Sequence, residues 1–129
     1  MTDEKAVNLA LVGTGAWSGS VGDAMRNSTK VNLVTCFDDI RAKREAFSAK
    51  FDCDCEESFE NVLKRADIDG IHLATPNQYH PEQTLLAARY GKHVFVEKPI
   101  ANTPATAKPL PRPTIFCIFS SPTFVLISF

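Results

Sequence analysis

The fold is decided by VNLALVGTGAWSG, residues 7–19, which runs from an apolar stretch into a glycine-rich turn. Val7–Val12 is apolar except for Asn8, which predicts a strand in a sheet that is covered on both faces. Beyond the turn, apolar residues recur at helical spacing and predict one buried stripe: Trp17, Val21, Ala24 and Met25. The segment therefore predicts a strand, a tight turn and a helix, in that order.

The glycines of this turn predict a site that binds phosphate groups. Gly13 permits a tight turn, and Gly15 lets a pyrophosphate approach the free N–H groups at the start of the helix. The third small position of the usual motif holds Ser18, with Gly19 beside it. A plain strand–turn–helix connection without a ligand remains the alternative interpretation of the glycines alone.

Strand and helix patterns alternate along the chain with short connections. The predicted strands are Val31–Phe37, residues 70–75 and residues 93–96, with at best a short edge strand within residues 53–57. Three further helices are predicted. The first has Ile40, Phe47 and Phe51 on its inner face, and the second is capped by Ser58 and carries Phe59, Val62 and Leu63. The third begins at His80-Pro81 and ends at Gly91. This alternation predicts parallel strands joined by helical crossovers, hence a doubly wound α/β sheet.

An acidic residue stands where the second strand ends. Asp38 follows the glycines by about twenty residues, where a carboxylate accepts hydrogen bonds from the adenosine ribose and repels a 2′-phosphate. NAD is therefore favoured as cofactor, and NADP stays possible because Arg41 and Arg44 lie close by. An ordinary helix cap, which Asp39 could also provide, is the alternative role. Enzymes that use S-adenosylmethionine also have glycines after the first strand and an acidic residue after the second, so these two features fit such an enzyme as well.

Two further segments identify a family. ATPNQYH, residues 74–80, follows a predicted strand, and GKHVFVEKP, residues 91–99, follows the next predicted helix. The chain closely resembles the Gfo/Idh/MocA family over residues 7–102, because members carry T-P-N-x-x-H and then G-K-H-V-x-x-E-K-P at this spacing. The resemblance implies a Rossmann-type cofactor domain of a nicotinamide-dependent sugar or polyol oxidoreductase, followed by a C-terminal substrate domain.

The resemblance also implies the residues of the site. The pyrophosphate would be held by Gly13, Gly15 and the amides of Ala16 and Trp17, and the adenosine ribose by Asp38. The cofactor cleft would be lined by Thr75, Pro76, Asn77 and His80, with Glu97 near the nicotinamide ribose. Lys98 would be both a residue of this cleft and the catalytic lysine. A lysine beside the positive nicotinamide has its pKa lowered toward a range useful for proton transfer with a carbinol.

Several of these residues also have a purely structural interpretation. Lys98 could be a surface lysine after a strand, and His80 could cap a helix rather than contact a ligand. His72 is expected in the core, and His93 is expected to bond nearby backbone.

Composition narrows the partners. The chain has 129 residues, is 44% hydrophobic and 22% charged, and carries a formal charge of -1 at pH 7. This balance argues against a nucleic-acid or anionic-membrane surface. The family resemblance implies a small-molecule sugar or polyol as the partner, and a homo-oligomer stays open. Its four cysteines form no C-x-x-C pair, which predicts no metal site and a reduced, cytoplasmic setting.

The composition changes near residue 103. Residues 1–103 read as the cofactor domain, whereas residues 104–129 contain no acidic residue, start rich in proline and end apolar. The family's substrate domain, with its D-x-x-x-H helix, is missing, so we expect cofactor binding with little or no turnover. A frameshift is one explanation, because a shifted frame across Ala105–Pro109 could encode Asp-Gly-Glu-Ala. The other is a genuine short protein, a dinucleotide-binding or redox-sensing module whose apolar end docks on a partner or a sheet edge.

Overall fold

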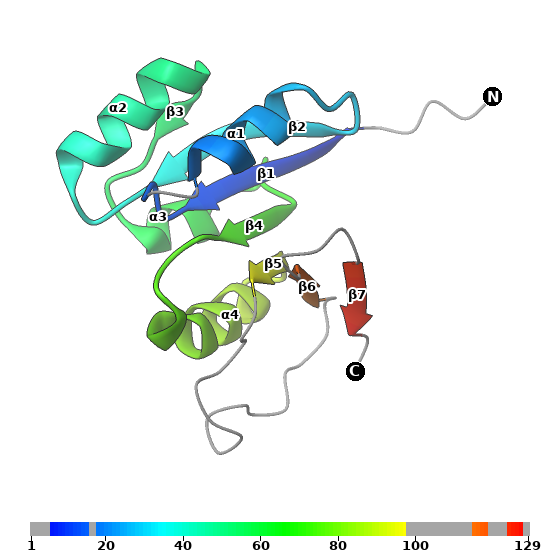
Figure 1. Cartoon of the computed structure of the whole chain (residues 1–129). Coiled ribbons are helices and arrows are strands. Elements are labelled where there is room, and N and C mark those ends of the chain that lie inside the picture. The colour runs from blue at the N-terminus through cyan, green and yellow to red at the C-terminus, as the bar shows by residue number, and fades with distance from the viewer. Residues whose placement is uncertain (1–5, 16–17, 98–114, 119–123, 128–129) are drawn as a thin grey trace.

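One seven-stranded sheet organises the computed structural model, which describes residues 6–15, 18–97, 115–118 and 124–127 (Figure 1). Its strands lie in the order β3-β2-β1-β4-β5-β6-β7, and all neighbours are parallel except β6 and β7. Their bounds are β1 Val7–Val12, β2 Val31–Phe37, β3 Asp54–Cys55, β4 Gly70–Leu73, β5 His93–Glu97, β6 Ile115–Ile118 and β7 Phe124–Ile127. The predicted α/β class and parallel sheet are confirmed.

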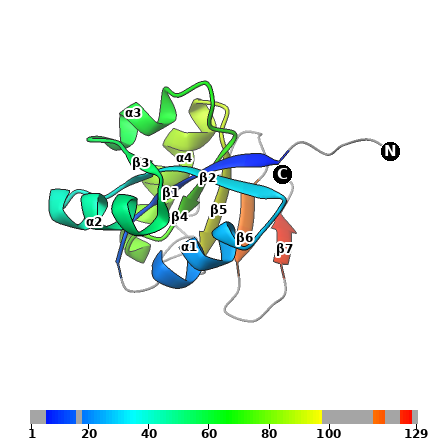
Figure 2. The same cartoon turned by 90° about the horizontal axis from the view of Figure 1, so that it is seen from above.

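Helices cover both faces of this sheet. The helices are α1 Ser18–Arg26, α2 Arg41–Phe51, α3 Phe59–Leu63 and α4 His80–Arg89, with the short 3₁₀ helix η1 Asn77–Tyr79 before α4. In the view from above, α1 and α2 lie on one side of the sheet and α3 and α4 on the other (Figure 2). The chain therefore forms the two-layered covering that a doubly wound sheet requires.

Capping residues and turn residues lie at the ends of α3 and α4, where the sequence predicts them. The Ser58 hydroxyl accepts the Asn61 N–H at 3.0 Å and caps α3. Pro81 stands in the first turn of α4, where its missing N–H removes no helical bond, and Gly91 follows the helix with a φ of 75°.

Two apolar clusters lie on the two faces, because successive residues of a strand point to opposite sides. Alternate residues of β1 show this directly: Ala10 and Val12 pack with Ile71, Leu73 and the α3 residues, whereas Leu11 packs with Cys36, Phe47 and Phe51. Phe47 and Phe51 thus occupy the inner face of α2 as predicted.

Two residues of the predicted apolar stripes are exposed instead. Ile40 is 52% exposed because it precedes α2 in extended conformation, with its N–H bonded to the Asp38 carboxylate. Ala24 is also exposed, and Gly22 takes the inner position of α1. A Cβ on Gly22 would lie 2.6 Å from the Phe51 ring, so glycine lets α1 approach α2 closely.

The strand order places a topological switch beside β1. The chain builds β2 and β3 on one side of β1 and then returns through α3 to build β4 and β5 on the other. The helices that follow β1 and β4, α1 and α4, therefore lie on opposite faces of the sheet (Figure 2), and ligands of open α/β sheets bind at the carboxyl ends of the strands at such a switch point.

The chain beyond residue 97 is described only at β6 and β7. β6 pairs with β5 in parallel, so this part of the apolar end lies against the sheet. The predicted domain boundary near residue 103 and the frameshift hypothesis concern residues outside the described ranges and stay predictions. Among the described residues, no helix has the length and apolar character needed to cross a bilayer.

Candidate dinucleotide-binding site

The predicted site residues converge on one edge of the sheet. The glycine turn follows β1, Asp38 follows β2, Ala74 and Thr75 follow β4, and Glu97 ends β5. These strands are parallel neighbours, so their carboxyl ends meet at the same edge. The strand predicted for residues 70–75 ends at Leu73, which leaves the following residues to form a loop of the site.

Gly13 is where the loops after β1 and β4 touch. Its N–H donates to the Phe37 carbonyl at 2.8 Å, and its φ is 95°, a conformation that favours glycine. A Cβ here would lie 2.7 Å from the Ala74 carbonyl carbon and 2.8 Å from the Thr75 nitrogen. Gly13 thus lets the two loops pack together, and it also forms the tight turn that the sequence predicts.

Gly15 is different, because the space at its Cα is open. A Cβ built there would meet no atom within 4 Å. Ser18 begins α1 and donates to the Gly15 carbonyl through its hydroxyl at 2.6 Å and its N–H at 3.1 Å. A ligand can therefore approach the backbone before the helix start, where N–H groups and the helix dipole favour an anion.

Asp38 joins the end of β2 to the glycine turn. Its Oδ2 accepts both the N–H and the hydroxyl of Thr14, each at 2.9 Å, and its Oδ1 accepts the Ile40 N–H at 2.8 Å. An ionised carboxylate offers about four acceptor positions. The described residues occupy three of them, which leaves about one position for a ligand.

The surroundings of Asp38 favour its charged form. Burial by itself would raise the pKa of this carboxyl, but the hydrogen bonds from Thr14 and Ile40, with the Lys43 charge, bring it below the ordinary value. The Arg44 guanidinium donates to the Asp38 backbone carbonyl at 3.2 Å, whereas Arg41 pairs with Glu45 at 2.7 Å. Of these two arginines, Arg44 is therefore the one that contacts the site.

Two side chains of α4 hold Thr75. Its hydroxyl hydrogen-bonds Gln83 Oε1 at 2.5 Å, and its carbonyl bonds His80 Nε2 at 2.7 Å. His80 is 1% exposed, so it acts on the site through the Thr75 backbone. Gln83 was not singled out by the sequence; its position one helical turn after His80, facing the same loop, is the signal that could have found it.

Other predicted residues are only partly placed. Pro76 is exposed, Asn77 begins η1, and Glu97 ends β5. Ala16, Trp17 and Lys98 lie outside the described residues, so their roles stay predictions. The part of the chain that the structure describes holds no group of three or more His, Cys, Asp or Glu residues that could bind a metal ion.

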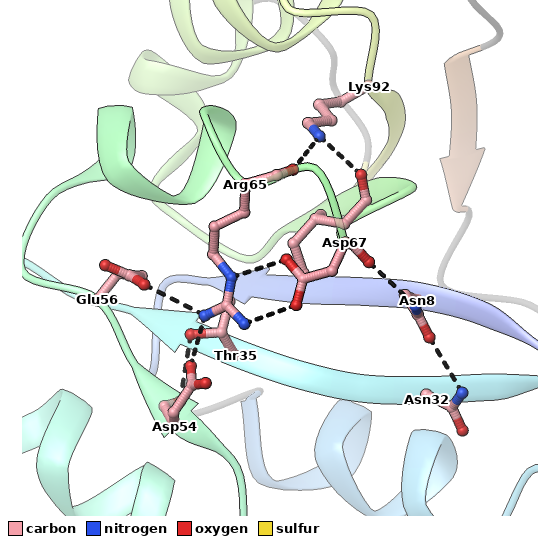
Figure 3. A network of polar contacts seen from close by, with 9 residues as sticks. Asn8, Asn32, Thr35, Asp54, Glu56, Arg65, Asp67 and Lys92 are labelled. Atoms are coloured by element: carbon pink, nitrogen blue, oxygen red, sulfur yellow. Dashed lines mark hydrogen bonds and ion pairs between the residues drawn. The ribbon is translucent and has the colours of Figure 1, made fainter.

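The lysine of the G-K-H segment serves the opposite edge of the sheet. Lys92 is 8% exposed, and its Nζ donates to the Arg65 carbonyl at 2.5 Å and the Ile68 carbonyl at 2.7 Å (Figure 3). Arg65 itself pairs with Asp54, Glu56 and Asp67, at 2.8, 3.2 and 2.8 Å. Lys92 therefore fixes the segment that leads into β4.

His72 lies in the core as expected, whereas the His93 side chain is exposed and the contact of His93 with the chain before β4 is made by its backbone. His72 is buried in β4 and its ring stacks on Phe95 with centroids 6.5 Å apart. The backbone N–H of His93 donates to the Asp69 carbonyl at 3.1 Å.

Comparison with known proteins agrees with this geometry. Residues 7–112 match the Gfo/Idh/MocA profile, described as an oxidoreductase family with an NAD-binding Rossmann fold. A 2,7-anhydro-N-acetylneuraminate hydratase from Mediterraneibacter gnavus is 34% identical over 97 residues, which are 75% of this chain and 25% of that protein.

Solved structures show the same relationship. A protein assigned as an NADPH-dependent oxidoreductase from Desulfitobacterium hafniense superposes with a TM-score of 0.77 and 36% identity, over 79% of this chain and 29% of that one. A protein assigned as a myo-inositol dehydrogenase from Sinorhizobium meliloti superposes with a TM-score of 0.75 and 28% identity, over 78% of this chain and 30% of that one. The chain thus spans about a quarter to a third of these relatives.

The methyltransferase alternative receives no support from these matches, whereas the open glycine turn and the Thr14–Asp38 contact fit a dinucleotide. The chain belongs to the Gfo/Idh/MocA oxidoreductase family and forms its NAD(P)-binding Rossmann domain.

Proposed function

We propose that this chain is the cofactor domain of an oxidoreductase that transfers hydride between NAD(P) and a carbinol of a sugar, polyol or cyclic diol. The observation that carries the proposal is the open space at Gly15, with Asp38 held beside the same glycine turn by Thr14. A bound nicotinamide would accept or supply the hydride. Two relatives, a 2,7-anhydro-N-acetylneuraminate hydratase and a protein assigned as a myo-inositol dehydrogenase, are named for a sugar derivative and a cyclic polyol, which supports this substrate class.

The residues divide the work of binding. The backbone at Gly13 and Gly15, with the amides of Ala16 and Trp17, would hold the pyrophosphate, and the free acceptor position of Asp38 would bind the ribose. Thr75, Pro76, Asn77 and Glu97 would line the nicotinamide side of the site, with His80 supporting Thr75. Asp38 favours NAD, whereas Arg44 beside it gives NADP some affinity.

Lys98 would handle the proton of the substrate hydroxyl. It follows Glu97, the last residue of β5, in the sequence. A lysine there can take a proton from a carbinol during oxidation and return it to the oxygen during reduction. A Rossmann domain by itself binds the cofactor without orienting a substrate, so we expect residues 1–129 to bind cofactor with very weak turnover.

An NADH titration followed by fluorescence tests the binding step. We expect saturable binding by the wild type and a weakened complex in Gly15→Val, whose side chain fills the space open in the structure. Lys98→Ala is the matched control, because a residue of the chemical step should leave cofactor affinity nearly unchanged. No saturable NADH binding, or equal affinity in Gly15→Val, would contradict the proposal.

A second candidate is a non-catalytic dinucleotide-binding or redox-sensing module that acts through a partner. It requires only cofactor binding, which the open space at Gly15 and the fixed Asp38 carboxylate support. Absorbance at the NADH band distinguishes the two: slow NAD reduction in the presence of myo-inositol, lost in Lys98→Ala, supports the enzyme. NADH binding with no reduction and no effect of added polyols supports the module.

A further inference from the structure

The strand order divides the dinucleotide site into two halves. β1 lies between β2 and β4, so the glycine turn stands between Asp38, which follows β2, and Thr75, which follows β4. In a Rossmann domain the pyrophosphate binds at the turn after the first strand and the adenosine ribose at the acid after the second. A dinucleotide bound in this way would extend its nicotinamide riboside toward the side of Thr75.

The backbone of Thr75 is held at several points. A Cβ on Gly13 would lie 2.8 Å from the Thr75 nitrogen, and the N–H of the preceding Ala74 donates to the Val12 carbonyl at 2.8 Å. The Thr75 carbonyl bonds His80 Nε2 at 2.7 Å. Because a carbonyl oxygen only accepts, Nε2 is the nitrogen of His80 that carries a proton. These contacts set the position of the Thr75 backbone without Gln83.

Gln83 controls the Thr75 side chain instead. The Thr75 hydroxyl donates to Gln83 Oε1 at 2.5 Å, and both residues are half-buried. A hydroxyl has a single proton and two acceptor lone pairs. With its proton given to Gln83, the Thr75 oxygen meets any other partner as an acceptor.

The nicotinamide riboside carries donors that match this acceptor, namely the carboxamide NH₂ group and the ribose hydroxyls. We propose that Gln83 is a positioning residue of the dinucleotide site: it takes the Thr75 proton and thereby orients the hydroxyl oxygen as an acceptor for the nicotinamide riboside. The inference rests on the function proposed above, and it adds a residue that acts on the cofactor through Thr75.

The ratio of NADH affinity to ADP affinity tests the assignment, because ADP has the adenosine ribose and pyrophosphate but lacks the nicotinamide riboside. Gln83→Met removes the acceptor and keeps a straight side chain that favours a helix. We expect NADH affinity to fall about 3- to 10-fold and ADP affinity to stay unchanged, both measured by calorimetric titration.

Gln83→Glu should preserve the ratio, because it keeps an acceptor oxygen at the same distance along the side chain. The reduced nicotinamide ring is neutral, so the added charge acts on both nucleotides through their phosphates. Glu82→Met is the matched control: it places the same new side chain at the exposed neighbouring position of α4 and should also preserve the ratio.

A double variant tests whether Gln83 acts through Thr75. Thr75→Val should lower the ratio by itself, because it removes the hydroxyl. Adding Gln83→Met to Thr75→Val should lower the ratio no further, since the two residues share one interaction. A second, additive loss would overturn the proposal.

The remaining outcomes separate this inference from the proposed function. Wild-type protein without saturable NADH binding would contradict the proposed function, and the role of Gln83 would fall with it. Wild-type binding with an unchanged ratio in Gln83→Met would overturn the role of Gln83 alone. An equal fall of NADH and ADP affinity in that variant would also overturn it, because Gln83 would then only tie α4 to the loop.

Discussion

Asp38 and Thr14 are joined twice through one oxygen, because Oδ2 accepts both the N–H and the hydroxyl of Thr14 at 2.9 Å. The acid after the second strand therefore holds the glycine turn in place. The proposed contact with the ribose and the geometry of the loop thus involve the same carboxylate.

Replacing this carboxylate should weaken NADH binding strongly. Hydrogen bonds to a charged group contribute about 1.5–3 kcal/mol, so we expect Asp38→Ala to lower NADH affinity about 10- to 100-fold. Thr14→Val is the matched variant, because it removes only the hydroxyl bond and keeps the N–H bond; its loss should be smaller. Calorimetric titration with NADH measures both, and an unchanged affinity in Asp38→Ala would remove the ribose assignment.

The same substitution should shift the choice of cofactor. Without its negative charge, the position no longer repels a 2′-phosphate, and Arg44 remains beside the Asp38 carbonyl. We expect the ratio of NADPH to NADH affinity to rise in Asp38→Ala and to fall again when Arg44→Ala is added. Competition of the two nucleotides in one titration gives the ratio, and a ratio that stays constant would exclude an electrostatic basis for the preference.

Replacement by alanine should lower the stability of the protein at Gly13 and its cofactor affinity at Gly15. At Gly13 a Cβ meets the Ala74 backbone at 2.7 Å and φ is 95°, so we expect a loss of about 1–3 kcal/mol in the free energy of unfolding. At Gly15 the space is open, so Gly15→Ala should keep its stability and lose cofactor affinity. Urea unfolding beside NADH titration separates the two effects, and equal stability of both variants would contradict the contact at Gly13.

The sequence predicted this edge of the sheet because its signals are local. Strand, glycine turn and the acid after the second strand lie in consecutive segments, and their parallel pairing brings them together. Which glycine serves which purpose depends on contacts between distant segments: Gly13 against Ala74, and Gly22 against Phe51. Periodicity also placed Ile40 on the inner face of α2, although the Asp38 carboxylate holds it before the helix, where it is exposed.

His72 should make the stability of the protein depend on pH. Burial, with a smaller effect of His80, lowers the pKa of His72 from 6.5 to about 4. The unfolded chain therefore takes up a proton that the folded chain refuses, and stability is full above pH 6.5 and falls as the pH drops toward 4. From pH 7 to 5 the expected loss from this group is about 2 kcal/mol.

Urea unfolding at both pH values checks this expectation. His72→Phe should remove most of the loss, because an apolar ring keeps the packing against Phe95 without a titrating group. His93→Asn, at an exposed histidine, should leave the loss unchanged. If His72→Phe and the wild type lose equal stability between the two pH values, the dependence comes from other groups.

Lys92 and Lys98 belong to one motif but should affect different properties. Lys92 lies before β5 and bonds the carbonyls of Arg65 and Ile68, so Lys92→Met leaves two acceptors without their charged donor. We expect a loss of about 1.5–3 kcal/mol in the free energy of unfolding, with NADH affinity unchanged because the site lies at the carboxyl ends of the strands. Lys98→Ala should preserve stability and remove any residual turnover.

Urea unfolding, NADH titration and a turnover assay on both variants test these different effects of Lys92 and Lys98. Loss of NADH affinity in a folded Lys92→Met protein would show that the two edges of the sheet are coupled.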